Sequence, residues 1–220
     1  MKEYNYEGNL KFEGEYLKDE RNGNGKEYNS EGELIFEGEY LNNKRWNGKG
    51  KEYSQYGNRI IYEGGYLEGE RNGEVKEYYE NGKIKVEGEY LKGKKSGKIK
   101  EYDNNGILTF EGEYENDKRV KGKEYDDNDH LLYEGVYLNG ERIGKGKEYY
   151  GNGNILYEGE YINGKWNGTG KEYYQNGKIK YIGEFLDGRW NGKGKEYYQN
   201  GKVKFSGKFI NGDKIKNPKK

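Results

Sequence analysis

Aromatic and charged residues alternate over short segments of this chain, and these segments recur at a nearly constant distance. Each segment reads as an aromatic residue or Val, any residue, Gly, any residue, then Tyr or Phe. Alternation with a period of two is typical of a β-strand that has one apolar face. We therefore expect a strand at each of the nine occurrences, which begin at Phe12, Phe36, Tyr62, Val86, Phe110, Tyr133, Tyr157, Tyr181 and Phe205.

A second element, Lys-Glu-Tyr, lies between these segments, and turn signals separate the two. Asn-Gly or Asp-Gly occurs at both ends of the unit, for example at residues 163–164 and 176–177. Such pairs favour two-residue type I′ turns, which need positive φ at both central positions. One unit of about 24 residues is thus one β-hairpin. The predicted fold is all-β: an elongated, twisted, single-layer antiparallel meander of stacked hairpins, similar to a solenoid.

The repeat boundaries follow from this spacing. We expect a half repeat in residues 1–11 and a closing half repeat in residues 205–212, followed by a basic tail at 213–220. Between the two halves, full repeats begin at residues 12, 36, 62, 86, 110, 133, 157 and 181.

The central Gly of each segment lies between two aromatic residues on one face. In residues 155–162 that face carries Ile155, Tyr157, Gly159 and Tyr161. Without a Cβ, Gly leaves room for rings to lie across the backbone. The opposite face carries Glu158 and Glu160 against Lys-rich segments, which predicts cross-strand ion pairs in solvent. An aromatic face left open would be a large apolar patch, so we expect a protein partner or a second copy to cover it.

The register of the second strand has two solutions. If residues 163–164 form a tight turn, Gly159 pairs with Gly168, and Tyr173 falls on the polar face. A bulge near Gly170 would reverse this placement. The sequence leaves the face of this tyrosine open.

The net charge is zero, with 40 basic and 40 acidic residues. This balance argues against nucleic acid as a partner, because phosphate binding depends on an excess of Lys and Arg. The first ten residues lack the apolar stretch of a signal peptide, and there is no cysteine. We therefore expect a cytoplasmic protein, peripheral to a membrane or the cytoskeleton if it is attached to either.

Few residues offer catalytic or metal-binding chemistry. His130 is the one histidine, and we interpret it as a turn residue. The cluster Asp126, Asp127, Asn128 and Asp129 lacks the Gly and Glu of a calcium loop. Residues 168–171 resemble a phosphate loop but lead into a strand, where such a loop needs a helix. We expect no catalytic residue, no cofactor and no bound metal, and therefore no enzyme.

One set of residues differs from its surroundings and is the candidate binding site. These residues follow the second aromatic of each unit by five positions, and we expect them to occupy one turn edge at about 10 Å spacing. They are either solvated turn residues or a surface for an acidic partner or an anionic membrane, with Trp at the interface. The set is Arg21, Arg45, Arg71, Lys95, Arg119, Arg142, Trp166 and Trp190.

The repeat resembles the MORN (membrane occupation and recognition nexus) repeat over nearly the whole chain. Its pattern of one Tyr and five spaced Gly is matched in full by Tyr157, Gly159, Gly164, Gly168, Gly170 and Gly177. Val75 and Ile99 replace a Gly, and insertions or deletions near repeats two and five predict irregular register there. The resemblance implies arrays of β-hairpins that act as scaffolds through protein contacts, self-association or membrane proximity.

The expected function is therefore a repeat scaffold that binds another protein through its aromatic face or its hairpin edge. The alternative is peripheral attachment to an anionic, phosphoinositide-type membrane through the basic edge. Expected partners are one or more proteins, including a second copy in a homodimer.

Overall fold

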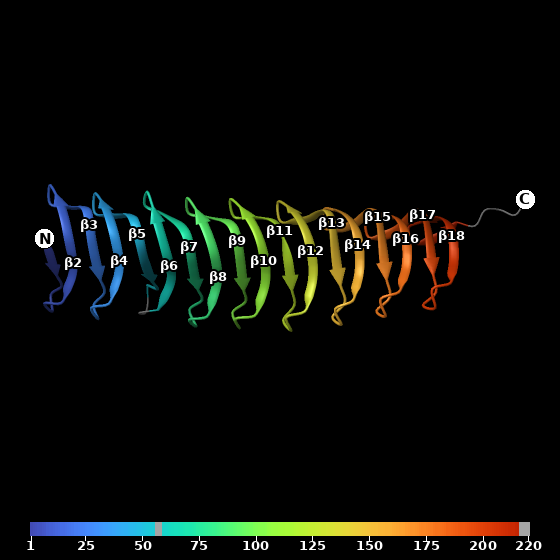
Figure 1. The fold of residues 1–220 in the computed structure, drawn as a ribbon, viewed down its shortest axis with the longest axis horizontal. Helices are drawn as coiled ribbons and strands as arrows, with labels where there is room; N and C mark the ends of the chain where they lie inside the picture. Colours follow the sequence, from blue (N-terminus) through green and yellow to red (C-terminus); the bar gives the residue numbers. More distant parts are fainter. Residues whose placement is uncertain (56–58, 216–220) are drawn as a thin grey trace, which may run out of the picture. The chain divides into compact units, whose positions relative to one another are not determined.

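The structure is a computed structural model that describes residues 1–55 and 59–215. These residues form nineteen β-strands and no helix, and strands that follow one another in the chain pair antiparallel (Figure 1). The predicted all-β fold and the hairpin meander are confirmed. In the described segments there is accordingly no helix long and apolar enough to cross a membrane.

Even-numbered strands carry the ring–Gly–ring segments, and odd-numbered strands from β1 to β17 end in Lys-Glu-Tyr. The even-numbered strands are β2 (Leu10–Leu17), β4 (Leu34–Leu41), β6 (Ile60–Leu67), β8 (Ile84–Leu91), β10 (Leu108–Glu115), β12 (Leu131–Leu138), β14 (Ile155–Ile162), β16 (Ile179–Leu186) and β18 (Val203–Ile210). The odd-numbered strands are β1 (Lys2–Tyr4), β3 (Glu20–Tyr28), β5 (Lys44–Tyr53), β7 (Glu70–Tyr78), β9 (Lys94–Tyr102), β11 (Lys118–Tyr125), β13 (Glu141–Tyr149), β15 (Lys165–Tyr173), β17 (Arg189–Tyr197) and β19 (Asp213–Ile215).

The chain divides into two compact units. The first consists of Met1–Ile107 with Tyr114–Asp117, and the second of Leu108–Glu113 with Lys118–Lys220. Within each unit the hydrogen-bonded neighbours of a strand are the strands before and after it in the chain. Each unit therefore has the same repeating hairpin structure.

Tight turns join each even-numbered strand to the next odd-numbered strand. At Asn163 and Gly164 both φ angles are positive, 50° and 74°, as a type I′ turn requires. The twist of this turn matches the right-handed twist of the flanking strands. The predicted type I′ turns are confirmed at this end of the hairpins.

The turns at the opposite end have a different geometry. Of Asn176 and Gly177, the glycine alone has positive φ, 76°. The Gly177 N–H donates to the Tyr174 carbonyl at 2.9 Å, and the Tyr174 N–H donates to the Lys178 carbonyl at 2.8 Å. This is the longer hairpin connection, in which a type I turn is followed by a left-handed glycine. The prediction of two-residue type I′ turns is wrong at this end.

The register of the β14–β15 hairpin places two glycines opposite each other beneath the ring of Tyr157. Gly159 pairs with Gly170 and not with Gly168, the partner that a tight turn without a bulge would give it. The difference arises because Gly168 and Thr169 lie outside the pairing and form a bulge of two residues. A bulge of two leaves the alternation of side chains unchanged, so the residues beyond it keep their faces.

Tyr173 therefore points to the polar face, away from the rings. Its hydroxyl donates to the Glu158 carboxylate at 2.7 Å, and Lys171 contacts the same carboxylate at 2.7 Å. The open question about this tyrosine is thereby answered. The ion pair between Glu158 and a lysine of the facing strand is also as predicted.

Two of the irregular repeats change the length of an odd-numbered strand. Strand β5 has ten residues and β11 has eight, where a regular odd-numbered strand has nine. In β5 the extra residue places Gly48 opposite Gly38 and Gly50 opposite Phe36. The second predicted insertion falls between Tyr53 and Tyr62, a segment that includes residues 56–58, outside the described part of the chain.

The core of each unit is a continuous layer of aromatic rings on one face of the strands. Tyr157 packs edge-on against Tyr161 of its own strand and Phe185 of β16, with centroids 5.4 and 5.1 Å apart. At most 2% of the surface of the ring-position residues is exposed: Phe12, Phe36, Tyr62, Val86, Phe110, Tyr133, Tyr157 and Tyr181. The expectation of an open aromatic face is therefore wrong, since the chain buries these residues itself.

The predicted basic tail begins inside the fold. Residues 213–215 form β19, in which Asp213 pairs with Ile210 and Lys214 with Phe209. The rest of the predicted tail, residues 216–220, lies outside the described residues.

Candidate functional site

The eight predicted binding residues lie inside the strands and not in the turns. Each is the second residue of an odd-numbered strand, and Arg142 and Trp166 pair with Tyr137 and Tyr161. Paired residues point to the same face of a sheet, so these side chains lie on the face of the rings. The expectation that they project from the turn edge is wrong. We call this set the cover column: Arg21, Arg45, Arg71, Lys95, Arg119, Arg142, Trp166 and Trp190.

Cover-column side chains lie flat on the aromatic layer. The guanidinium carbon of Arg142 is 4.2 Å from the ring centroid of Tyr133, and that of Arg71 is 4.0 Å from Tyr62. Trp166 stacks on Tyr157 with centroids 4.4 Å apart and planes 4° apart. At the same position of the repeat, an arginine thus covers the ring by a cation–π contact and a tryptophan covers it by stacking. Corresponding contacts join Arg21 to Phe12, Arg45 to Phe36, Arg119 to Phe110 and Trp190 to Tyr181.

Lys95 is the exception in the column, because Val86 replaces the ring in its hairpin. Its ammonium lies 5.4 Å from the ring of Tyr114, on the next even-numbered strand. The volume that a ring would fill is taken by Ile99, which replaces the second glycine and is 1% exposed.

Glutamates of the Lys-Glu-Tyr elements bind cover-column residues, and Glu27, Glu124 and Glu148 each bind two of them. Arg71 contacts Glu52 at 2.6 Å and Glu77, six residues further on, at 2.7 Å. Arg142 likewise binds Glu124 and Glu148. The indole N–H groups of Trp166 and Trp190 donate to Glu148 and Glu172 at 3.1 and 2.8 Å. Charge-assisted bonds of this kind fix the geometry as well as contributing energy.

These contacts shift the titration of the carboxyl groups. The hydrogen bond from Arg21 lowers the pKa of Glu3 to about 2, against the opposing effect of burial. At Glu52, burial alone would raise the pKa, but hydrogen bonds from Arg71 and Tyr66 outweigh it and the pKa is lowered. Glu3 and Glu52 are therefore charged partners of the cover column at neutral pH.

The positive charges of the cover column are partly buried and paired with carboxylates. Its cationic side chains are partly buried, from 11% exposed at Arg21 to 31% at Arg119. Each has a carboxylate within 4 Å. The column therefore holds the aromatic layer in place and presents little unpaired positive charge to a ligand.

The face opposite the rings carries a ladder of tyrosine, glutamate and lysine. Tyr149 donates to Glu134 at 2.7 Å, and Lys147 contacts the same carboxylate at 3.3 Å. The ladder continues with bonds from Tyr28 to Glu13, from Tyr102 to Glu87, from Tyr125 to Glu111 and from Tyr173 to Glu158. In this ladder each of these glutamates accepts a tyrosine hydroxyl, and Lys147 and Lys171 pair with two of them.

A row of exposed aliphatic residues, which the sequence analysis missed, lies beside the type I′ turns. Each member is the last residue of an even-numbered strand and points away from the rings, with four in each unit. We call it the aliphatic row: Leu17, Leu41, Leu67, Leu91, Leu138, Ile162, Leu186 and Ile210, between 37% and 58% exposed. Its sequence signal was the recurring Leu or Ile directly after the second aromatic, interrupted at Glu115.

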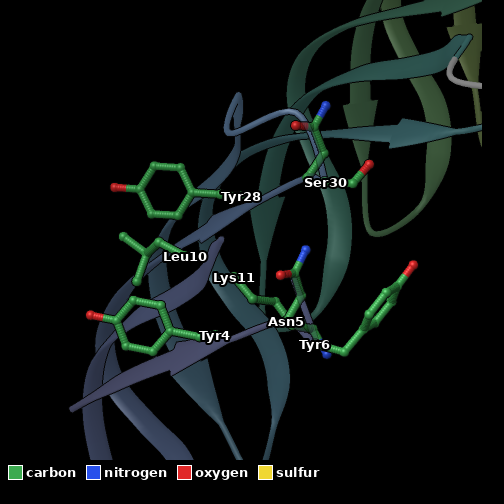
Figure 2. A pocket seen from close by; sticks show the side chains of 8 residues that line it. Tyr4, Asn5, Tyr6, Leu10, Lys11, Tyr28 and Ser30 are labelled. Atoms are coloured by element: carbon green, nitrogen blue, oxygen red, sulfur yellow. The ribbon is translucent and has the colours of Figure 1, made fainter. Parts of the chain in front are cut away.

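An open pocket lies at the first turn of the chain (Figure 2). Tyr4, Leu10 and Tyr28 line it together with the turn residues Asn5 and Asn29. The Asn5 side-chain oxygen accepts N–H bonds from Asn9 at 2.8 Å and Glu7 at 3.0 Å. The Asn5 side chain therefore closes the turn and is not directed at a ligand.

His130 and the acidic residues 126–129 form a turn, as predicted. The Asp126 carboxylate accepts N–H bonds from Asn128 and His130, each at 2.9 Å, and lies 3.1 Å from the His130 ring. These backbone bonds, led by that from His130, lower the pKa of Asp126. Within residues 1–55 and 59–215, no three acidic or His side chains gather closely enough to hold a metal ion.

Comparison with known protein families gives matches along most of the chain. The model described as MORN repeat variant matches residues 71–92, 95–116, 142–163 and 166–187. The model described as MORN repeat matches residues 12–33, 110–130 and 181–203. No curated protein matches the chain.

Proposed function

Because the chain belongs to the MORN repeat family, we propose that it is a non-enzymatic scaffold that binds another protein along its hairpin edge. MORN repeats are a non-catalytic repeat type and are generally protein or membrane interaction modules. Similar side chains recur in most hairpins of both units, which suits repeated contacts with an extended partner better than a single reaction centre.

The observation that carries the proposal is the exposure of the aliphatic row. Ile162 is 55% exposed beside its turn, whereas Tyr161, the residue before it, is 1% exposed. Apolar side chains aligned on an otherwise polar surface are typical of a protein contact. The aromatic face is the weaker candidate, because its rings are already buried within the chain.

The competing proposal, attachment to an anionic membrane, receives less support. The predicted basic edge consists of cover-column cations that lie on rings and bind glutamates. Binding phosphate headgroups would require these pairs to break, which costs free energy that surface lysines would not cost.

The test compares two double variants in the second unit. Leu138→Ser with Ile162→Ser removes two members of the aliphatic row. Val120→Ser with Leu132→Ser, at 36% and 37% exposure, is the matched control at exposed aliphatic residues that do not belong to the row. The protein and both variants are used to isolate partners from the native lysate at two salt concentrations, and bound proteins are quantified.

We expect the row variant to retain at least about tenfold less of a specific protein that the control still binds at high salt, because a combined loss of about 1.4 kcal/mol from the two truncations lowers affinity tenfold. If both variants retained the partner protein equally, the hairpin edge would not be the contact surface. Binding to anionic vesicles that disappears at high salt, with no retained protein, would favour the membrane.

A further inference from the structure

The charges beside the aliphatic row alternate in sign along the first unit. Each belongs to the first residue of an odd-numbered strand, which lies directly opposite a leucine of the row, so the two side chains share one face. Along this edge, the upper one in Figure 1, leucines therefore alternate with charges that are negative, positive, negative and positive in turn. The pairs are Leu17 with Glu20, Leu41 with Lys44, Leu67 with Glu70, and Leu91 with Lys94.

These four charged side chains are unpaired in the part of the chain that the structure describes. All four residues are exposed, and none of their side chains forms an ion pair or a hydrogen bond with another described residue. The cover-column cations of the same hairpins, by contrast, all bind glutamates. The edge charges are therefore available to a second surface.

Charges within the turns reinforce this alternation. Glu68 adds a second negative charge beside Glu70, and Lys92 adds a second positive charge beside Lys94. The two turns that precede them in the first unit contribute no net charge. Each hairpin tip thus keeps the sign of the strand residue that follows its turn.

An alternating row of charges is complementary to the same row running in the opposite direction. We consider a second copy that lies antiparallel to the first, with a twofold axis at Leu67. Glu20 of one copy then faces Lys94 of the other. Lys44 likewise faces Glu70, and symmetry repeats both contacts, so four opposite-charge contacts form. A parallel copy shifted by one hairpin would form three.

The leucines match in the same arrangement. Leu67 meets its own copy at the axis, and Leu41 meets Leu91 on either side of it. Leu17 lies at the rim, opposite Glu115. The four leucines are between 37% and 58% exposed in the single chain, so this contact would remove apolar surface from water.

We propose that the hairpin edge of the first unit binds the same edge of a second copy, forming an antiparallel homodimer with its twofold axis at Leu67. The homodimer rests on the proposed function in that it uses the aliphatic row, but it uses the row of the first unit alone. Four hairpins at about 10 Å spacing give a contact roughly 40 Å long and one or two side chains wide. Such a contact is at the low end of specific interfaces, so we expect a dimer that dissociates on dilution.

The edge of the second unit is not complementary to itself in this way. Its charges, again opposite the row, belong to Glu141, Lys165, Arg189 and Asp213. The same antiparallel arrangement would bring Glu141 against Asp213. It would also bring Lys165 against Arg189, and like charges in contact disfavour association. The row of the second unit is thereby left for a different partner.

The experiment measures dimer formation by sedimentation of the purified full chain over a series of concentrations. Glu70→Lys brings like charges together at two of the four contacts. Glu80→Lys makes the same change of net charge at an exposed residue in the turn at the other end of β7, and is the matched control. Lys44→Glu combined with Glu70→Lys restores opposite charges about Leu67, but would place like charges together about Leu41 or in the shifted parallel arrangement. Thermal unfolding checks the fold of each variant.

We expect Glu70→Lys to weaken dimerisation at least about tenfold, Glu80→Lys to leave it within about twofold of the parent, and the double variant to recover most of the loss. Equal effects of the two single variants, or no recovery in the double variant, would overturn the proposal. So would a parent that stays monomeric up to about 1 mM.

A variant of the second unit separates this proposal from the proposed function. Leu138→Ser with Ile162→Ser should dimerise like the parent, whatever protein it loses from the lysate. Loss of the dimer in this variant would overturn the homodimer proposal and would leave the lysate result to decide the proposed function.

A disulfide tests the position of the axis, because a residue on a twofold axis faces its own copy. The chain has no native cysteine, so Leu67→Cys can link two copies through one position alone. The matched control is Leu186→Cys in the second unit, since both leucines are 48% exposed. After oxidation we expect at least about tenfold more linked dimer from Leu67→Cys than from the control, because docking raises the effective concentration of the two thiols. Equal yields would overturn the proposed axis.

Discussion

The indole ring of Trp166 lies parallel to the phenol ring of Tyr157, with centroids 4.4 Å apart, and donates its N–H to Glu148. In the preceding hairpin, Arg142 lies over Tyr133 and binds the same glutamate. A cation and an indole therefore fulfil one structural role, covering a ring while bonding to the same carboxylate.

Replacing Arg142 tests this equivalence. Arg142→Ala removes the cover of Tyr133, leaves Glu148 without its charged donor and leaves Glu124 with Arg119 as its remaining charged partner, so we expect unfolding to become easier by about 2 kcal/mol. Arg142→Trp should recover at least half of this loss, because the indole restores the stack and one hydrogen bond. Urea unfolding measures both.

The matched control is Arg189→Ala, at an exposed arginine one residue before Trp190. Its effect should lie within about 0.5 kcal/mol of zero, as at most surface positions. Equal losses for both alanine variants would argue against a special role of the cover column.

Acid should weaken the first hairpin through Glu3. Its pKa is lowered to about 2 by the Arg21 hydrogen bond, whereas the unfolded chain titrates near the ordinary value of 4.5. The folded state thus favours the charged form, and this stabilisation is complete above about pH 4.5 and lost as the pH falls towards 2. Carboxyl NMR titration should show the Glu3 pKa rising towards its ordinary value in Arg21→Gln. An unchanged pKa would contradict the assignment.

Alkali should unfold the aromatic layer cooperatively. Burial raises the pKa of Tyr133 and of Tyr181 to about 12, while tyrosine in an unfolded chain titrates near about 10. Folding favours the neutral phenol, so this stability is complete below about pH 10 and lost as the pH rises towards 12. Phenolate absorbance and circular dichroism should change together. Full titration near pH 10 with the sheet signal intact would contradict burial.

In the fourth hairpin, β8–β9, both the ring and the second glycine of the repeat are replaced. Val86 occupies the ring position, and Ile99 fills the space above Gly88. Val86→Phe alone should overpack the site at a cost of about 1–3 kcal/mol, and Ile99→Gly alone should leave a cavity at a cost of 2 kcal/mol or more. Together they recreate the ring over paired glycines. The double variant should be more stable than the sum of the single effects by at least about 1 kcal/mol; additive losses would show that the positions are not coupled.

Local patterns predicted the strands, because ring–Gly–ring segments and Asn-Gly turns each have one physical explanation. The bulge at Gly168 and Thr169 was not predictable, since Gly168 and Gly170 are equivalent partners for Gly159 until the hydrogen bonds are known. The inward direction of the cover column was predictable. A two-residue turn at 163–164 already places Trp166 opposite Tyr161. Burial of the rings was not predictable, because it depends on how successive hairpins pack.

The central claim is that paired glycines exist to admit the ring that lies across them. A Cβ on Gly159 would come within 2.4 Å of the Tyr157 hydroxyl oxygen and 2.7 Å of the Gly170 Cα, whereas a Cβ on Gly151 would meet nothing within 4 Å. Neither glycine has positive φ, so the two sites differ in available space and not in backbone strain.

The most direct test is the free energy of unfolding of Gly159→Ala and Gly151→Ala, measured side by side in urea. We predict that Gly159→Ala lowers stability by about 1–3 kcal/mol through overpacking, and that Gly151→Ala stays within about 0.5 kcal/mol of the parent. Equal stability of the two variants would contradict the account.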